Sequence, residues 1–372
     1  MKVPPVKICF SEQDKANIKN EIDEVLSSGM LTLGKHNKRF EEEFSKYTGS
    51  KHAIAVNSGT SSLEIPLRIT GVKGKNVIVP TNTFFATPAS VVHAGGNVKF
   101  ADVDVETLSI NAETVKELAD ENTTAMMMVH IGGIISPEVE KIQKFCRENN
   151  ITLIEDAAHA HGCSINGKNA GTFGKASSFS FYPTKVITSG EGGMIITDDD
   201  EIDRRARIFR DQGKASFTTN DAVEMGYNWR MSEVHAIIGY HQLKRLDEFI
   251  ENRNKIAQIY NKELNDVDKI QPLKLPENSR CNYYKYIAVL DSSVNRDVFK
   301  KTLKENYEVS CSGEVYDKPC HLQPVFSYLG YKKGDLPVSE DLCSKHVCLP
   351  IFPEMTDEQA VYVADSIRKV LK

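Results

Sequence analysis

Short apolar runs alternate with helix-like stretches from about residue 50 to about residue 200. The strand-like runs are AIAV (53–56), NVIVP (76–80), VKFADV (98–103), AMMMVH (125–130), ITLIED (151–156), SSFSFY (177–182) and GMIIT (193–197). Near-continuous apolar strands separated by helices are typical of a mainly parallel sheet with helices on both faces. The pattern therefore predicts an α/β fold for this part of the chain.

One of the helix-like stretches is SPEVEKIQKFCRENN (136–150). Ser136 can cap this helix and Pro137 fits its first turn. After about residue 250 the pattern changes to YYKYIAVL (283–290), a helix near 296–306 and a closing helix. The apolar positions that share one face of the closing helix are Ala360, Val363, Ala364, Ile367 and Val370. We therefore predict a large domain over 1–248 and a smaller α+β domain over 249–372.

Composition and charge exclude several classes of protein. The 372 residues include 46 basic and 51 acidic residues, which give a net charge of −5, and no basic block indicates nucleic acid or an anionic membrane as a partner. No apolar run is long enough for a signal peptide or a spanning helix. The eight cysteines form no C-x-x-C pair. We predict a cytoplasmic protein with reduced thiols.

In open sheets of this type, ligands bind beyond the carboxyl ends of the strands. The first strand leads into NSGTSS, where Gly59 and Thr60 start a helix whose N–H groups suit a phosphate, although the stretch also suits an ordinary helix cap. The second strand leads to Phe84, which suits either the core or a stacking surface for a flat ring.

Charged residues follow two later strands. Asp156 ends ITLIED, where a carboxylate needs a cationic partner or serves as a helix cap. His159 and His161 come next, but no third ligand at a recognisable spacing accompanies them, so we expect no metal. Lys185 lies in FSFYPTKVITSGEGG with no carboxylate within five residues, whereas most lysines are solvated surface charges.

One cofactor, pyridoxal 5′-phosphate, would use all of these groups. Its phosphate would lie on the helix start at Gly59 and Thr60, and its ring would stack on Phe84. Asp156 would keep the ring nitrogen protonated, and Lys185 would form the Schiff base with the aldehyde. The lack of carboxylates near Lys185 then has a reason, because a nearby anion would hold the amine in its protonated, unreactive form.

The order of the motifs resembles that of the DegT-type sugar aminotransferases, a branch of the fold type I pyridoxal-phosphate enzymes. The motifs cover nearly the whole chain and are NSGTSSL, PTNTFFAT, FADVD, EDAAHAHG, FSFYPTK, SGEGG, GYNWRMSE and HLQP. The resemblance implies a mainly parallel seven-stranded sheet in the large domain and a homodimer with shared active sites.

The resemblance also implies roles for single residues. Lys185 would be the Schiff-base lysine, Asp156 the partner of the pyridine nitrogen and Phe84 the stacking ring. The further positions that it implies are phosphate contacts at Gly59, Thr60 and Ser180, a cofactor contact at His159, residues given to the neighbouring subunit at Asn228 and Arg230, and a sugar contact at His321.

Two departures from the family pattern bear on the substrate and the cofactor site. Many members carry Gln where this chain has His159, and a branch of the family has His there. Many members also read V-H-L-Y-G after the fourth strand, whereas this chain reads VHIGGI (129–134) and lacks the aromatic residue, which indicates a changed substrate pocket.

The expected activity is transfer of an amino group from an amino acid, glutamate, to a keto-sugar. The sugar would be a nucleotide-linked keto-deoxy sugar or a free keto acid sugar of surface polysaccharide biosynthesis. The alternatives are a pyridoxal-phosphate-dependent dehydratase or aminodehydratase and a regulator that binds the cofactor without turnover. Lys185 favours transamination, because some relatives that remove a hydroxyl have histidine in its place.

Overall fold

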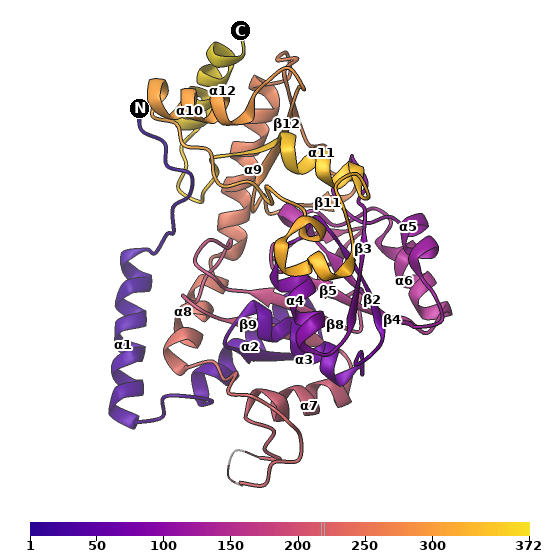
Figure 1. Ribbon diagram of the computed structural model, residues 1–372. Helices are drawn as coiled ribbons and strands as arrows, with labels where there is room; N and C mark the ends of the chain where they lie inside the picture. The colour runs from indigo at the N-terminus through magenta and orange to yellow at the C-terminus, as the bar shows by residue number, and fades with distance from the viewer. Residues whose placement is uncertain (217, 219) are drawn as a thin grey trace.

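The structure is a computed structural model that describes residues 1–216, 218 and 220–372 (Figure 1). Within these residues, seven strands form one sheet in the order β1-β9-β8-β5-β4-β2-β3. Their bounds are β1 His52–Val56, β2 Asn76–Pro80, β3 Asn97–Ala101, β4 Thr123–Val129, β5 Thr152–Asp156, β8 Ala176–Ser180 and β9 Gly193–Thr197. β9 runs antiparallel to both of its neighbours and the other pairs are parallel. The predicted mainly parallel seven-stranded sheet is confirmed.

Helices cover both faces of this sheet because its strands are apolar on both sides. In β4, Met126 and Met128 belong to one buried cluster, whereas Ala125 and Met127 belong to another. Side chains alternate between the faces of a strand, so an unbroken apolar run needs cover on each face. The clusters place α3 (Gly59–Ile69), α4 (Ala86–His93) and α7 (Asp200–Arg210) on one face, and α2 (Lys35–Thr48), α5 (Ala112–Leu118), α6 (Val139–Glu148) and α8 (Glu233–Leu243) on the other.

The predicted start of α6 is wrong by two residues. The helix begins at Val139, and its N-cap is Glu138. The Ser136 hydroxyl accepts a hydrogen bond from the Glu138 N–H at 3.2 Å, and the Ser136 carbonyl accepts one from the Val139 N–H at 3.1 Å. These local bonds form a turn that holds Pro137 outside the helix.

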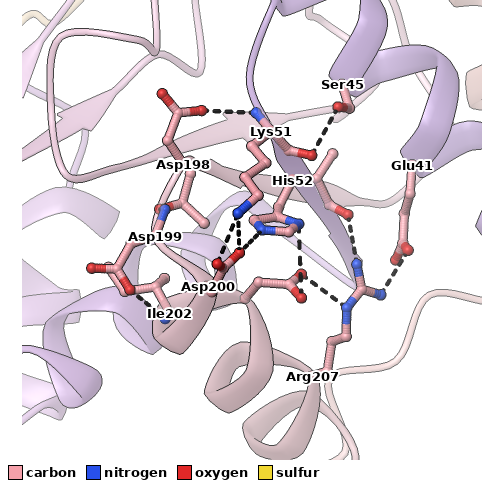
Figure 2. A network of polar contacts seen from close by, with 12 residues as sticks. Glu41, Ser45, Lys51, His52, Asp198, Asp199, Asp200, Ile202 and Arg207 are labelled. Carbon is pink, nitrogen blue, oxygen red and sulfur yellow. Dashed lines mark hydrogen bonds and ion pairs between the residues drawn. The ribbon is translucent and has the colours of Figure 1, made fainter.

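The free edge of β1 is covered by charged side chains instead of another strand. The Ala55 N–H donates to Glu41 Oε1 at 2.9 Å, and the Ala55 carbonyl accepts from Arg210 Nη1 at 2.8 Å. Arg207 Nη2 donates to the Ala53 carbonyl at 3.2 Å, and Figure 2 shows Arg207 beside Glu41 at this edge. Charged side chains that satisfy edge groups prevent pairing with another chain. They also hold β1 in place at the start of the segment that leads to α3.

The rest of the chain forms a second core. A sheet of β10 (Ile270–Pro272), β12 (Tyr286–Leu290) and β13 (His346–Leu349) packs against α9 (Leu246–Glu263), α10 (Arg296–Tyr307) and α12 (Asp357–Leu371). The other elements are α1 (Glu12–Ser28), α11 (Pro337–Lys345), the small sheet of β6 (Ser164–Ile165), β7 (Lys168–Asn169) and β11 (Ser279–Arg280), and the 3-10 turns η1 (Ile131–Gly133), η2 (Cys320–Leu322) and η3 (Pro324–Leu329).

The helix α9 connects the two cores. Its Phe249 and Ile250 lie in the core of the large sheet, whereas Ile256 and Tyr260 lie in the second core. We propose a domain boundary between residues 248 and 249, which falls inside this helix. The N-terminal segment returns to the second core, because Val3 is buried there and pairs with Val309 (Figure 1).

Candidate active site

A cavity of about 600 Å³ lies at the carboxyl ends of the parallel strands. The loops that follow β1, β2, β5 and β8 line one side, and residues 284–285 and 313–316 line the other. The predicted site residues that line it are Gly59, Thr60, Phe84, Asp156, His159, Ser180 and Lys185. The structure therefore brings together, in one cavity, residues that are far apart in the sequence.

Gly59 and Thr60 form the first turn of α3. Ser58 is the N-cap, and its hydroxyl accepts the Ser61 N–H at 3.1 Å. The N–H groups of a first turn have no partner within the helix and point toward its open end, where an anion is stabilised. A Cβ at Gly59 would lie 2.8 Å from Ser180 Cβ, so glycine is what allows α3 to begin this close to the end of β8. The two elements thus form a narrow cradle with N–H and hydroxyl donors.

Asp156 is 6% exposed at the end of β5. Its Oδ2 accepts from Thr87 Oγ1 at 2.7 Å and its Oδ1 from the Ala158 N–H at 3.2 Å. Burial raises the pKa of Asp156, and these hydrogen bonds together with the charge of Lys185 oppose the rise. No helix begins at this residue, so the alternative of a helix cap is wrong. Asp156 is instead a buried carboxylate that faces a cavity and has capacity for a further donor.

Lys185 lies in the turn after β8, where its N–H donates to the Tyr182 carbonyl at 2.9 Å. Its Nζ lies 4.9 Å from the centroid of the Tyr284 ring. Among the described residues, no carboxylate oxygen lies within 4.0 Å of this Nζ. Burial lowers the pKa of Lys185 from 10.5 to about 8, although the charge of Asp156 opposes the change. The amine is therefore partly neutral near neutral pH, unlike a solvated surface lysine.

His159 is buried between the two sides of the cavity. Its ring stacks on Tyr284 with 4.2 Å between centroids, and its Nδ1 accepts the Gly132 N–H at 3.3 Å. Burial lowers the pKa of His159 well below its ordinary value. A neutral ring whose Nδ1 accepts must carry its proton on Nε2, which leaves Nε2 as a donor. Asn282 Nδ2 donates to the His159 carbonyl at 2.8 Å and so fixes this segment.

His161 does not face the cavity. It packs edge-on against Phe44 and Phe179, and burial lowers its pKa to about 3. In the described ranges, no group of three His, Cys, Asp or Glu side chains could hold a metal ion.

Several cavity residues were missed by sequence reasoning. Tyr284, Lys285 and Tyr316 come from the C-terminal part of the chain and line the same cavity as Asp156. The aromatic cluster YYKY (283–286) was the one available signal, but it was used only to predict the smaller α+β domain. Phe84 is 60% exposed, so the interpretation of Phe84 as a core residue is wrong and it is free to contact a ligand.

Asn228 and Arg230 do not line the cavity of their own chain. Arg230 Nη1 donates to Asp211 Oδ1 at 2.5 Å, and Asn228 is exposed. We call residues 226–230 the arm. It runs beside the end of β1, because the Asn57 N–H donates to the Trp229 carbonyl at 2.8 Å. The arm therefore passes next to the phosphate cradle without entering it.

His321 also lies outside the cavity. It is 1% exposed, its Nδ1 lies 2.8 Å from Thr81 Oγ1, and its Nε2 lies 3.2 Å from Glu340 Oε1. Both ring nitrogens already have partners, so this chain gives His321 no route to a sugar in the cavity. The HLQP motif did not indicate that His321 lies next to Thr81, which directly follows β2.

The fold and the cavity together define an α/β aminotransferase. A model of the DegT/DnrJ/EryC1/StrS aminotransferase family matches residues 12–368, and the chain belongs to this family. The chain is 33% identical to a GDP-perosamine synthase of Vibrio cholerae, with 95% of each chain covered. It is 35% identical to a pleiotropic regulatory protein of Geobacillus stearothermophilus, with 96% of this chain and 95% of that protein covered.

A solved structure with the same fold holds a cofactor. The crystal structure of NtdA from Bacillus subtilis with bound cofactor PMP has a TM-score of 0.89 and 26% identity, and the match covers 97% of this chain and 83% of that chain. The comparisons confirm the predicted family, fold, sugar aminotransferase class and cofactor, pyridoxal phosphate. Within the described residues, no helix is both long and apolar enough to cross a membrane.

Proposed function

We propose that this aminotransferase moves an amino group from glutamate to a keto-sugar. The sugar is a nucleotide-linked keto-deoxy sugar or a free keto acid sugar of surface polysaccharide biosynthesis, and the reaction takes place in the cytoplasm. The name of the Vibrio cholerae relative supports the nucleotide-linked form. The observation that carries the proposal is the meeting of Lys185, Asp156 and the Gly59–Ser180 cradle in one cavity.

The residues of the cavity fit pyridoxal phosphate. The cradle is too narrow for a Cβ at Gly59 and presents donors that match a phosphate. Asp156 has no ion-pair partner among the described residues, and a protonated ring nitrogen would supply a donor to it. The exposed face of Phe84 offers a stacking surface. When bound, pyridoxal phosphate supplies an aldehyde that accepts an amine and a ring that withdraws electrons from the carbon attached to that amine.

Lys185, Asp156 and His159 would then each have a separate role in the reaction. Lys185 Nζ would hold the cofactor until the donor amine takes its place, and it would then accept and return the proton of the donor α-carbon. The pKa of Lys185, lowered to about 8, keeps part of the amine in the neutral form that accepts a proton. Asp156 would hold the proton on the ring nitrogen, and His159 Nε2 would be available to donate a hydrogen bond into the cavity.

The transfer is tested on purified protein loaded with pyridoxal phosphate. Adding glutamate should convert the absorbance band of the bound aldehyde form to that of the amine form. Adding keto-sugars, nucleotide-linked and free, should reverse the change and yield a product in which one oxygen has been replaced by an amine, as measured by mass. The regulator alternative, which the name of the Geobacillus relative favours, requires that the band stay unchanged with every donor and acceptor.

We also propose that two chains share each active site through the arm. Next to the arm, Met225 is 88% exposed and Val223 is 60% exposed, which is apolar surface that a second copy would bury. In a two-fold dimer the contact occurs twice, once for each cavity. Asn228 and Arg230 would then contact the cofactor of the partner.

Mixed dimers distinguish an active site that two chains share from one that a single chain forms alone. Inactive Lys185→Ala chains are refolded together with inactive chains that carry Asn228→Ala and Arg230→Ala. If the arm acts in the partner, half of the random dimers contain one intact cavity, and activity returns to about a quarter of the wild-type level. If the arm acts in its own chain, each cavity keeps a defect and no activity returns.

A further inference from the structure

The cavity contains a second lysine that the proposed chemistry does not use. Among the described residues that line it, Lys185 and Lys285 are the only lysine or arginine side chains. Lys285 Nζ lies 5.4 Å from the centroid of the Tyr284 ring, and Lys185 Nζ lies 4.9 Å from the same centroid. One aromatic ring thus contacts both ammonium groups.

The ammonium group of Lys285 has no ion-pair partner among the residues that the structure describes. No described carboxylate lies within 4.0 Å of its Nζ, which donates one hydrogen bond, to the Gly313 carbonyl at 3.1 Å. The nearby Glu314 is already paired with Lys300 at 2.5 Å. An ammonium has three donors, so two donors of Lys285 remain for a ligand. The Gly313 carbonyl fixes the direction of the ammonium at the cavity wall.

We propose that Lys285 binds the carboxylate of the amino-acid donor. The inference rests on the proposed donor and on Lys185 as the amine that the donor replaces. The α-carboxylate of an amino acid is attached to the same carbon as its amine, so it must lie close to the position of Lys185 Nζ. Lys285 is the cation whose ammonium lies over the same Tyr284 ring as Lys185 Nζ, and its direction is fixed by the Gly313 carbonyl. Lys285 is therefore a specificity-determining residue for amino acids over simple amines.

Equilibrium binding tests this role without turnover. The probe is maleate, an unreactive dicarboxylate, titrated calorimetrically into the protein loaded with pyridoxal phosphate. Lys285→Met should raise the Kd of maleate about 10- to 100-fold, the effect of one charge-assisted hydrogen bond, and Lys285→Arg should restore most of the affinity. The matched control is Lys369→Met, because Lys369 also lies over a tyrosine ring, 6.0 Å from the centroid of Tyr307 on the far side of the second core.

A second titration tests whether Lys285 binds a diphosphate instead of a carboxylate. GDP serves as the probe for a sugar-linked diphosphate, and its Kd should be the same in the wild type and in Lys285→Met. An unchanged Kd of maleate in Lys285→Met, or a loss of affinity for GDP alone, would overturn the proposal. Absence of maleate binding in the wild-type protein would overturn it as well.

The kinetics of the half-reaction with glutamate distinguish a failure of this inference from a failure of the proposed function. In the half-reaction with glutamate, Lys285→Met should raise the apparent KM about 10- to 100-fold and change the limiting rate by less than about threefold, because the contact is equal in the ground and transition states. If wild-type protein does not react with glutamate while the maleate series behaves as expected, the proposed donor fails and the carboxylate site stands. A fall in the limiting rate with KM unchanged would contradict the role in binding.

Discussion

The two walls of the cavity are built in different ways. On the sheet wall, Asp156 and Ser180 end buried strands, and Thr87 of α4 holds Asp156 through a 2.7 Å hydrogen bond. On the C-terminal wall, Tyr284 and Lys285 precede β12, and the other contacts come from the loop 313–316. On the sheet wall Gly59 and Ser180 pack closely together, whereas the C-terminal wall presents the long side chains of Tyr284, Lys285 and Tyr316. The first arrangement suits one constant cofactor, and the second suits the substrates that exchange.

The largest expected effect is the loss of turnover in Lys185→Ala, a change on the sheet wall. The amine that holds the cofactor and moves the proton is then absent. The variant should still bind pyridoxal phosphate through the cradle and Asp156, as measured by equilibrium dialysis. Lys175→Ala, at the exposed start of the same strand segment, should keep wild-type turnover. Near-wild-type turnover in Lys185→Ala would remove Lys185 from the mechanism.

The next largest effect is expected for Asp156→Asn. An amide does not keep the ring nitrogen protonated, so the rate of the glutamate half-reaction should fall about 100- to 1,000-fold. The Kd of pyridoxal phosphate should rise less than about tenfold, because the shape of the side chain is nearly unchanged. Stopped-flow absorbance measures the rate, and an unchanged rate would mean that Asp156 has only a structural role.

Substitutions at one glycine on each wall allow the two walls to be compared directly. A Cβ at Gly59 would lie 2.8 Å from Ser180 Cβ, whereas a Cβ at Gly313 would have no atom within 4 Å. Gly59→Ala should therefore widen the cradle and raise the Kd of pyridoxal phosphate at least about tenfold, the effect of losing one or more charge-assisted hydrogen bonds. Gly313→Ala should leave this Kd unchanged. Equal effects of the two substitutions would contradict the difference between the walls.

The pH dependence of cofactor uptake tests the environment of Lys185. Burial lowers its pKa to about 8, so the neutral fraction rises about tenfold per pH unit below that value and levels off above it. The second-order rate of pyridoxal phosphate uptake by the cofactor-free protein should follow the same curve. A lysine with the ordinary pKa of 10.5 would give a rate that still rises at pH 9.

The smallest effect is expected for Tyr284→Phe on the C-terminal wall. The ring that contacts His159 and both lysines is kept, and the hydroxyl that is lost makes one long contact, 3.3 Å, to Thr184 Oγ1. The Kd of pyridoxal phosphate and the rate with glutamate should each change less than about threefold. Tyr284→Ala, which removes the ring, should have the larger effect on the KM for glutamate.

Sequence reasoning was successful for the sheet wall for a physical reason. A strand that is buried on both faces must be apolar, and the residue at its end is the first that can carry polar chemistry. That rule located Asp156 after β5 and Gly59 after β1. It failed for the start of α6, because the local hydrogen bonds of Ser136 compete with the helix at short range.

The amino-acid sequence by itself determined the order of the strands along the chain, the family and the cofactor, and it predicted the cavity-lining positions Gly59, Asp156, Ser180 and Lys185. The tertiary structure alone decided that Tyr284 lies under Lys185, that Thr87 holds Asp156, that His321 is enclosed by Thr81 and Glu340, and that the arm stays outside its own cavity. Local patterns report which residues are buried and which end a strand. They do not report which distant side chains meet, because those contacts depend on how the second core packs against the large sheet.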